Sequence, residues 1–70
     1  MFIEVHDLND KSSILLNVDD ISRIEERRAG SIVYMRGVAD DFDGTKHQIS
    51  VLVAENYSDV KMRLTKIILP

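Results

Sequence analysis

The chain is 70 residues long, carries a formal net charge of −3 at pH 7 and contains no cysteine. This length predicts a single domain, residues 1–70, of marginal stability, because small domains bury only about 60% of their unfolded surface. Disulfides are excluded and no convincing cluster of metal ligands is present, so self-association is the remaining common source of added stability. Acidic and basic residues are interleaved, which argues against broad binding to a phosphate backbone.

The amino-terminal residues lack the features of a secretory signal. Glu4 and Asp7 stand where such a signal needs a basic start and an unbroken apolar core. No apolar run approaches the roughly 20 residues that cross a bilayer. We therefore expect a cytoplasmic protein without a membrane span, which also agrees with the absence of cysteine.

The first third of the chain predicts a β-hairpin followed by a turn. Residues 2–7 alternate, with Ile3 and Val5 on one face. A cluster of turn-forming residues follows, and residues 12–17 are predicted to be the returning strand. Asp19 and Asp20 are suited to cap a short turn, so we expect a 3₁₀-like turn or a bulge there.

Three more strands are predicted in the middle of the chain. The first covers residues 22–28, and residues 31–36, rich in β-branched and aromatic side chains, form a central strand. Residues 37–46 are a long connection. It is either an extended flexible hairpin tip or two strand ends that continue into the loop. Residues 47–53 form the last strand.

A capped amphipathic helix is predicted at the end of the chain. With Asn56 as N-cap, Asp59 stands at the third helical position, near free amides and the positive end of the dipole; Ser58 is the alternative start. The apolar stripe consists of Tyr57, Val60, Leu64, Ile67 and Ile68. The expected fold class is α+β, an antiparallel sheet of four or five strands with one C-terminal amphipathic helix against one face.

No catalytic, cofactor or metal site is predicted. Residues 41–44 match only a fragment of a calcium-binding loop, and we interpret them as a solvated hairpin tip. His6 and His47, even with Glu4, leave a zinc site short of ligands. No serine stands in a nucleophile-elbow context, and a chain this small has difficulty forming a pocket of several hundred Å³ alone. We expect no enzyme.

Three aromatic residues and an open strand edge are the candidate protein contacts. Phe42, at an acidic loop tip, either folds back over the sheet or packs on another chain. Phe2 and Tyr34 are assigned to the sheet face that the helix leaves uncovered. An unpaired edge strand is a further candidate, because it is a template for strand addition.

A set of arginines supports an alternative function. We expect them to gather at one end of the sheet, where they would contact nucleic acid. Tyr34 would then serve as a stacking residue, although core or cross-strand packing is the preferred interpretation of Tyr34. Glu25 and Glu26 in the same strand oppose a phosphate backbone. The set consists of Arg23, Arg27, Arg28 and Arg36.

The order of these elements resembles the small flagellar and swarming-motility protein family. That family has a short hairpin, a Leu-Asn step, a hydrophobic–Glu segment, another strand pair and a C-terminal helix introduced by an acidic residue. The matching pieces span most of the chain: Leu16-Asn17, Ile21 to Ile24-Glu25, Ile32 to Tyr34, and Val53 to Glu55 with Val60. The resemblance implies a small accessory protein without catalysis and carries no functional residues over. Small proteins of phages and other mobile elements share the same outline.

The combined prediction is a non-enzymatic accessory protein of prokaryotic or phage type. It acts in the cytoplasm through protein–protein contacts, as a homo-oligomer and with an unidentified protein partner. It needs no cofactor. Nucleic-acid binding is the alternative function, and enzyme activity is the third.

Overall fold

A computed structural model describes residues 1–40 and 43–68. The elements are, in chain order, β1 (Phe2–His6), β2 (Ser13–Asn17), the 3₁₀ turn η1 (Val18–Asp20), β3 (Ile21–Arg27), β4 (Gly30–Asp40), β5 (Lys46–Val53) and α1 (Tyr57–Ile68). The α+β class with antiparallel strands and a C-terminal helix is confirmed. The single sheet of four or five strands is wrong, because the described strands form two sheets, β1–β2 and β3–β4–β5. No helix in this part of the chain has the length and apolar character needed to cross a membrane.

The division into two sheets occurs at η1. The Asn17 side-chain oxygen accepts a hydrogen bond from the Asp19 amide at 3.1 Å, which caps the turn. The Val18 amide donates to the Met1 carbonyl at 2.9 Å and holds the turn against the start of the chain. The chain therefore leaves the line of β2 before β3 begins, and these consecutive strands do not pair. The expected 3₁₀-like turn is confirmed.

The two sheets meet at one corner, where β1 ends. Asp7 forms an isolated antiparallel bridge with Val53. The Leu8 amide donates to the Leu52 carbonyl at 3.1 Å, and the Ala54 amide donates to the carbonyl of His6 at 2.7 Å. Among the described residues, backbone hydrogen bonds join the two sheets only at this corner. Away from it, the inner faces of the sheets enclose a common core.

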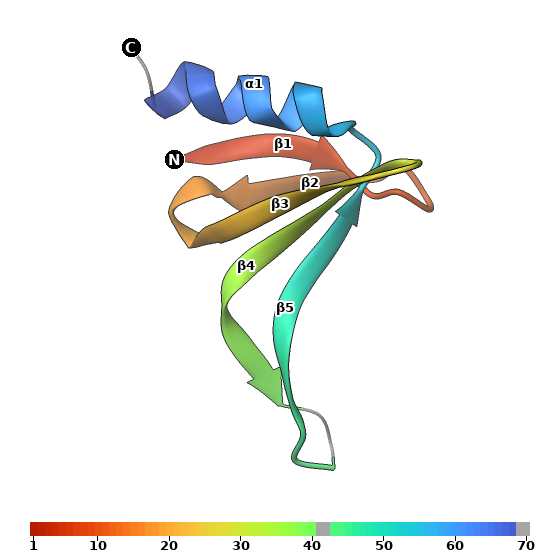
Figure 1. Ribbon diagram of the computed structural model, residues 1–70, viewed down its shortest axis with the longest axis vertical. Helices are drawn as coiled ribbons and strands as arrows, with labels where there is room; N and C mark the ends of the chain where they lie inside the picture. Colours follow the sequence, from red (N-terminus) through yellow and green to blue (C-terminus); the bar gives the residue numbers. More distant parts are fainter. Residues whose placement is uncertain (41–42, 69–70) are drawn as a thin grey trace.

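The core is shared by both sheets and α1, which lies alongside β1 (Figure 1). The pairing register places Ile3 opposite Leu16 and Val33 opposite Val51, so inward side chains on neighbouring strands meet. Full burial of a side chain of this size contributes about 1.5–3 kcal/mol. The helix thus closes the space between two sheets and does not cover one face of a single sheet. The buried apolar residues are Ile3, Val5, Leu16, Val33, Val53 and Val60.

The start of α1 agrees with the sequence prediction. The Asn56 side-chain oxygen accepts a hydrogen bond from the Asp59 amide at 2.8 Å, which confirms Asn56 as the N-cap. Val60 is fully buried, and Leu64 packs against the core. The side chains of residues 67–68, also assigned to the apolar stripe, lie outside the described part.

β4 and β5 continue beyond the rest of the molecule as a two-stranded arm, defined here as residues 36–40 and 46–50. The pairing of β3 with β4 stops at Met35, whereas β4 and β5 stay paired along the arm. Figure 1 shows the two strands leaving the body together. The molecule is accordingly 42 Å long in its longest dimension and 19 Å in its shortest.

The arm begins at an irregularity in β4. The register shifts between Tyr34 and Val38, and Gly37 has a φ of +91°, a conformation that glycine adopts at little cost. Such bulges bend a strand and increase its twist, which accounts for the departure of the arm from the body. Of the two outcomes expected for residues 37–46, strand ends that continue into the loop are confirmed.

Candidate interaction surfaces

The outer face of the β1–β2 sheet carries exposed apolar side chains. Phe2 is 60% exposed and Leu15 is 66% exposed. Because Phe2 pairs with Asn17 and Leu15 with Glu4, the two apolar side chains are diagonal neighbours on this face. Phe2 therefore lies on a surface that the helix leaves uncovered. Contiguous apolar surface of this kind is typical of contact sites.

Tyr34 lies on the outer face of the other sheet, so it does not share a surface with Phe2. The expectation of one uncovered face holding both residues is wrong because the strands form two sheets. The guanidinium carbon of Arg23 lies 4.3 Å from the centroid of the Tyr34 ring, a cation–π arrangement. A hydrogen bond from the Tyr34 side chain, helped by the charges of Arg27 and Arg23, lowers the pKa of Glu25. Tyr34 is thus already engaged with its neighbours.

The four arginines do not all gather at one end of the sheet. Arg23 and Arg27 flank Glu25, with a guanidinium nitrogen of each at 3.8 Å and 3.4 Å from its carboxylate. Arg28 lies in the turn between β3 and β4, and Arg36 lies just past the opposite end of β3. The length of β3 therefore separates Arg28 from Arg36 by roughly 20 Å. The expected cluster at one sheet end is therefore wrong for Arg36. Contact with nucleic acid stays a prediction, and Glu25 between the paired arginines opposes it.

The remaining candidates lie on or near the arm. Phe42 lies outside the described residues. Asp43 uses its carboxylate locally, because it accepts a hydrogen bond from the Thr45 amide at 2.9 Å, and this bond lowers the pKa of Asp43. His6 ends β1, whereas His47 lies on the arm opposite Ala39. Within residues 1–40 and 43–68, no group of three or more histidine and carboxylate side chains is placed to hold a metal ion.

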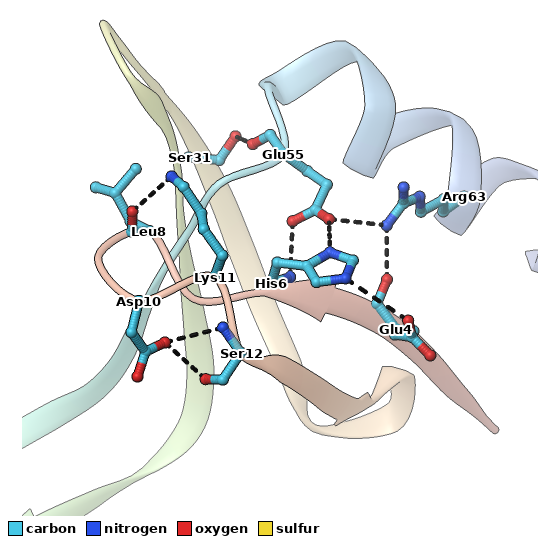
Figure 2. A network of polar contacts seen from close by, with 9 residues as sticks. All are labelled: Glu4, His6, Leu8, Asp10, Lys11, Ser12, Ser31, Glu55 and Arg63. Atoms are coloured by element: carbon cyan, nitrogen blue, oxygen red, sulfur yellow. Dashed lines mark hydrogen bonds and ion pairs between the residues drawn. The ribbon is translucent and has the colours of Figure 1, made fainter.

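Glu55 is the centre of a polar network that ties β1 to the connection between β5 and α1 (Figure 2). Its carboxylate accepts a hydrogen bond from the His6 amide at 2.9 Å and lies 2.6 Å from Nδ1 of the same residue. The Arg63 guanidinium lies 3.5 Å away, and the Glu55 side chain is only 9% exposed. Burial opposes ionisation, but the hydrogen bonds from His6 outweigh it and lower the pKa of Glu55.

Two further contacts extend this network. Arg63 donates to the Glu4 carbonyl at 2.6 Å and so covers part of the unpaired edge of β1. The Ser31 hydroxyl, in a residue only 1% exposed, donates to the Glu55 carbonyl at 2.9 Å. A carboxylate beside an imidazole also occurs in catalytic triads. Here the described contacts of the His6 ring are with Glu55 and Glu4. The arrangement fixes the corner where the sheets meet.

A groove of about 470 Å³ separates β3 from α1. Its floor is apolar, because Ile21, Ile24 and Leu64 also pack against the core. The volume falls in the range of about 300–1,000 Å³ that is usual for ligand pockets. The sequence did not predict this feature, since the groove exists only where the helix and the second sheet face each other. The lining residues are Val18, Ile21, Ser22, Arg23, Ile24, Tyr57, Lys61, Leu64 and Thr65.

The β5 part of the arm is exposed along its length. Every residue from 46 to 50 is exposed, including Ile49 at 40%. Ile49 is in phase with Val51 and Val53, which face the core. The apolar face of β5 therefore continues onto the arm, where neither the other sheet nor the helix covers it.

Comparisons with models of protein families, with curated proteins and with solved structures find no match for this chain. The resemblance to the small motility proteins, and to small phage proteins, stays a prediction from the sequence.

Proposed function

We propose that the chain is a non-enzymatic accessory protein that acts through protein–protein contacts and associates with a second copy through its arm. The observation that carries this proposal is the isolation of the arm. It is a two-stranded ribbon without a third strand beside it in the described chain, and an isolated two-stranded hairpin is only marginally stable in water. A partner that pairs with the arm removes this weakness.

Both strands of the arm present an edge to which a strand can be added. On one side, β3 stops pairing at Met35. On the other side, β5 meets the end of β1 only at Leu52 and Val53. In an antiparallel ladder, alternate residues turn their N–H and C=O groups away from the paired strand. Such groups on an edge are a template for another strand.

A second copy of the arm meets these requirements. Two β5 edges paired antiparallel about a twofold axis form one sheet that continues across both chains. Ile49 of each copy then lies on a face of the shared sheet beside the added strand, and an apolar contact across two strands contributes about 0.2–1 kcal/mol. Self-association also suits a chain of 70 residues, whose own core is small.

The biological setting is part of the same proposal. An accessory role agrees with the resemblance of the sequence to the small flagellar and swarming-motility proteins and to small phage proteins. The proposal includes a cytoplasmic location in a prokaryotic cell. The absence of cysteine supports a reducing compartment.

Light scattering across a concentration series tests self-association through the arm. We expect the mass to rise from 8.0 kDa towards twice that value as the concentration increases. Ile49→Asp should shift this rise to higher concentration, because a carboxylate replaces the apolar side chain in the cross-strand contact. Leu15→Asp is the matched control. It places the same charge at an exposed strand position of the other sheet and should behave as the wild type.

Two results would contradict the proposal. A mass of one chain at every concentration would show that the arm does not mediate self-association. Dissociation by Leu15→Asp but not by Ile49→Asp would move the interface to the outer face of β1–β2, where Phe2 lies.

A further inference from the structure

We infer that the groove between β3 and α1 binds an extended acidic segment of another protein, which adds as a strand to the free edge of β3. The inference rests on the proposed function, because it names a partner class for a protein-binding module. It uses a different surface, since none of the residues that line the groove belongs to the arm.

The first argument is the open edge of β3. This strand pairs with β4 on one side only. In the described chain, residues 22–27 make no backbone–backbone hydrogen bond outside that pairing. The register shift beside Ser22 marks a bulge, and Ser22 itself lines the groove. Bulges are frequent at sheet edges and next to functional sites.

The second argument is the position of the groove relative to this edge. A strand added to β3 lies about 4.8 Å from it, on the side facing α1. Alternate side chains of that strand point towards the groove floor, which Ile21, Ile24 and Leu64 provide. Recognition of this type takes affinity from main-chain hydrogen bonds and specificity from pockets for alternate side chains. The partner therefore carries apolar residues at every second position.

The third argument is charge. The charged residues of the groove lining are both cations, Arg23 and Lys61, although the whole chain has a net charge of −3. Arg23 is already engaged by Tyr34 and Glu25. Lys61 is exposed and forms no ion pair within the described residues. A carboxylate of the partner at Lys61 completes the site.

The length of the edge favours an internal acidic side chain over a chain terminus as the source of this carboxylate. The free edge of β3 continues to Arg27, beyond the part of the strand that lines the groove. A bound segment has room to extend in that direction with further backbone pairing. An Asp or Glu within the segment therefore meets Lys61 while the segment continues past it.

A random library of peptides of about ten residues, displayed on phage and selected on the intact chain, tests the inference. We expect selected peptides to share alternating apolar positions and an internal Asp or Glu. Lys61→Glu should weaken the best synthetic peptide by about tenfold or more in fluorescence anisotropy, because it replaces an attraction by a repulsion. Lys66→Glu, on the same helix but outside the groove lining, should change binding less than about twofold. Amides of residues 22–27 that face away from β4 should become protected from hydrogen exchange when the peptide binds.

Several outcomes would overturn the inference. One is that no peptide is selected. Another is that the selected peptides show helical spacing or lack a carboxylate. A third is that Lys61→Glu and Lys66→Glu weaken peptide binding equally. Light scattering on Lys61→Glu separates this inference from the proposed function. Retained self-association with lost peptide binding supports both. Lost self-association shows that a second copy occupies the groove, which overturns the inference. If no peptide binds but the wild-type mass still rises with concentration, the inference about the groove is rejected and the proposed self-association stands.

Discussion

Glu55 joins two parts of the chain that are far apart in sequence. Its hydrogen bond to the His6 amide spans 49 positions, and its carboxylate also lies near Arg63 of α1. Removal of one partner from a nearly buried charged group leaves the others unsatisfied, which costs more than the loss of a surface ion pair. The corner between the sheets therefore depends on this carboxylate.

Glu55→Gln should destabilise the protein by about 1.5–3 kcal/mol near pH 7, because hydrogen bonds to a charged group are lost. The pKa of Glu55 is lowered in the folded state. Its contribution is therefore fully present above the unfolded pKa of a glutamate, about 4.3, and is lost as the pH falls through the lower folded value. Urea unfolding of both proteins at neutral and acidic pH should show a difference that shrinks on acidification.

Glu4→Gln is the control for this prediction. The Glu4 side chain is 60% exposed and lies 3.7 Å from Nε2 of His6, so the pair is a surface contact. Its loss should cost no more than about 1 kcal/mol. Equal costs for the two glutamate substitutions would show that the network around Glu55 adds nothing beyond an exposed ion pair.

At the scale of the elements, Gly30 sets how closely β4 approaches β5. It has a φ of +106°, and a Cβ at this position would overlap the Val53 carbonyl oxygen. Gly37, at the start of the arm, has a φ of +91° but no atom within 4 Å of such a Cβ. The two glycines share a conformational requirement, and only Gly30 has a steric one as well.

Gly30→Ala should therefore destabilise the protein more than Gly37→Ala. We expect about 1 kcal/mol for Gly37→Ala from the backbone conformation alone. For Gly30→Ala we expect about 2–4 kcal/mol, because overlap with Val53 is added to the same conformational cost. Thermal unfolding of both variants measures the difference. Similar values would show that the β5 backbone moves aside at little cost.

The elements themselves were largely predictable from the sequence, but their partners were not. Local signals identified the N-cap at Asn56 and the turn after Asn17, because each depends on a side chain and an amide two or three residues away. Strand partners depend on contacts over long separations. The alternation of Ile3 and Val5 identifies the buried face of a strand, but it does not indicate which sheet contains that strand. The expected single sheet failed for this reason.

The functional surfaces were predictable only where the alternation of neighbouring residues determines whether a single side chain is exposed. The exposure of Phe2 follows from its alternation with Ile3, which is buried. The Glu55 network and the groove were missed, since both form from segments far apart in the chain. Nothing local in the sequence shows that the Arg23 side chain covers the ring of Tyr34.

At the scale of the whole molecule, the body and the arm differ in what stabilises them. The body has a core shared by two sheets and a helix. The arm extends β4 and β5 without a covering layer in the described chain, and residues 46–50 are all exposed. By itself this extension contributes little to stability. Its exposed edges and Ile49 are instead the surface that we propose for a second copy.

Amide hydrogen exchange at low and high protein concentration tests the association through the arm most directly. We predict that the outward-facing amides among residues 48–50 exchange rapidly in dilute solution and become protected as the concentration rises, because these amides become paired with a second strand. Amides of β1 and β2 should be unchanged. Arm amides that exchange at the same rate at every concentration, or protection confined to β1 and β2, would contradict this account.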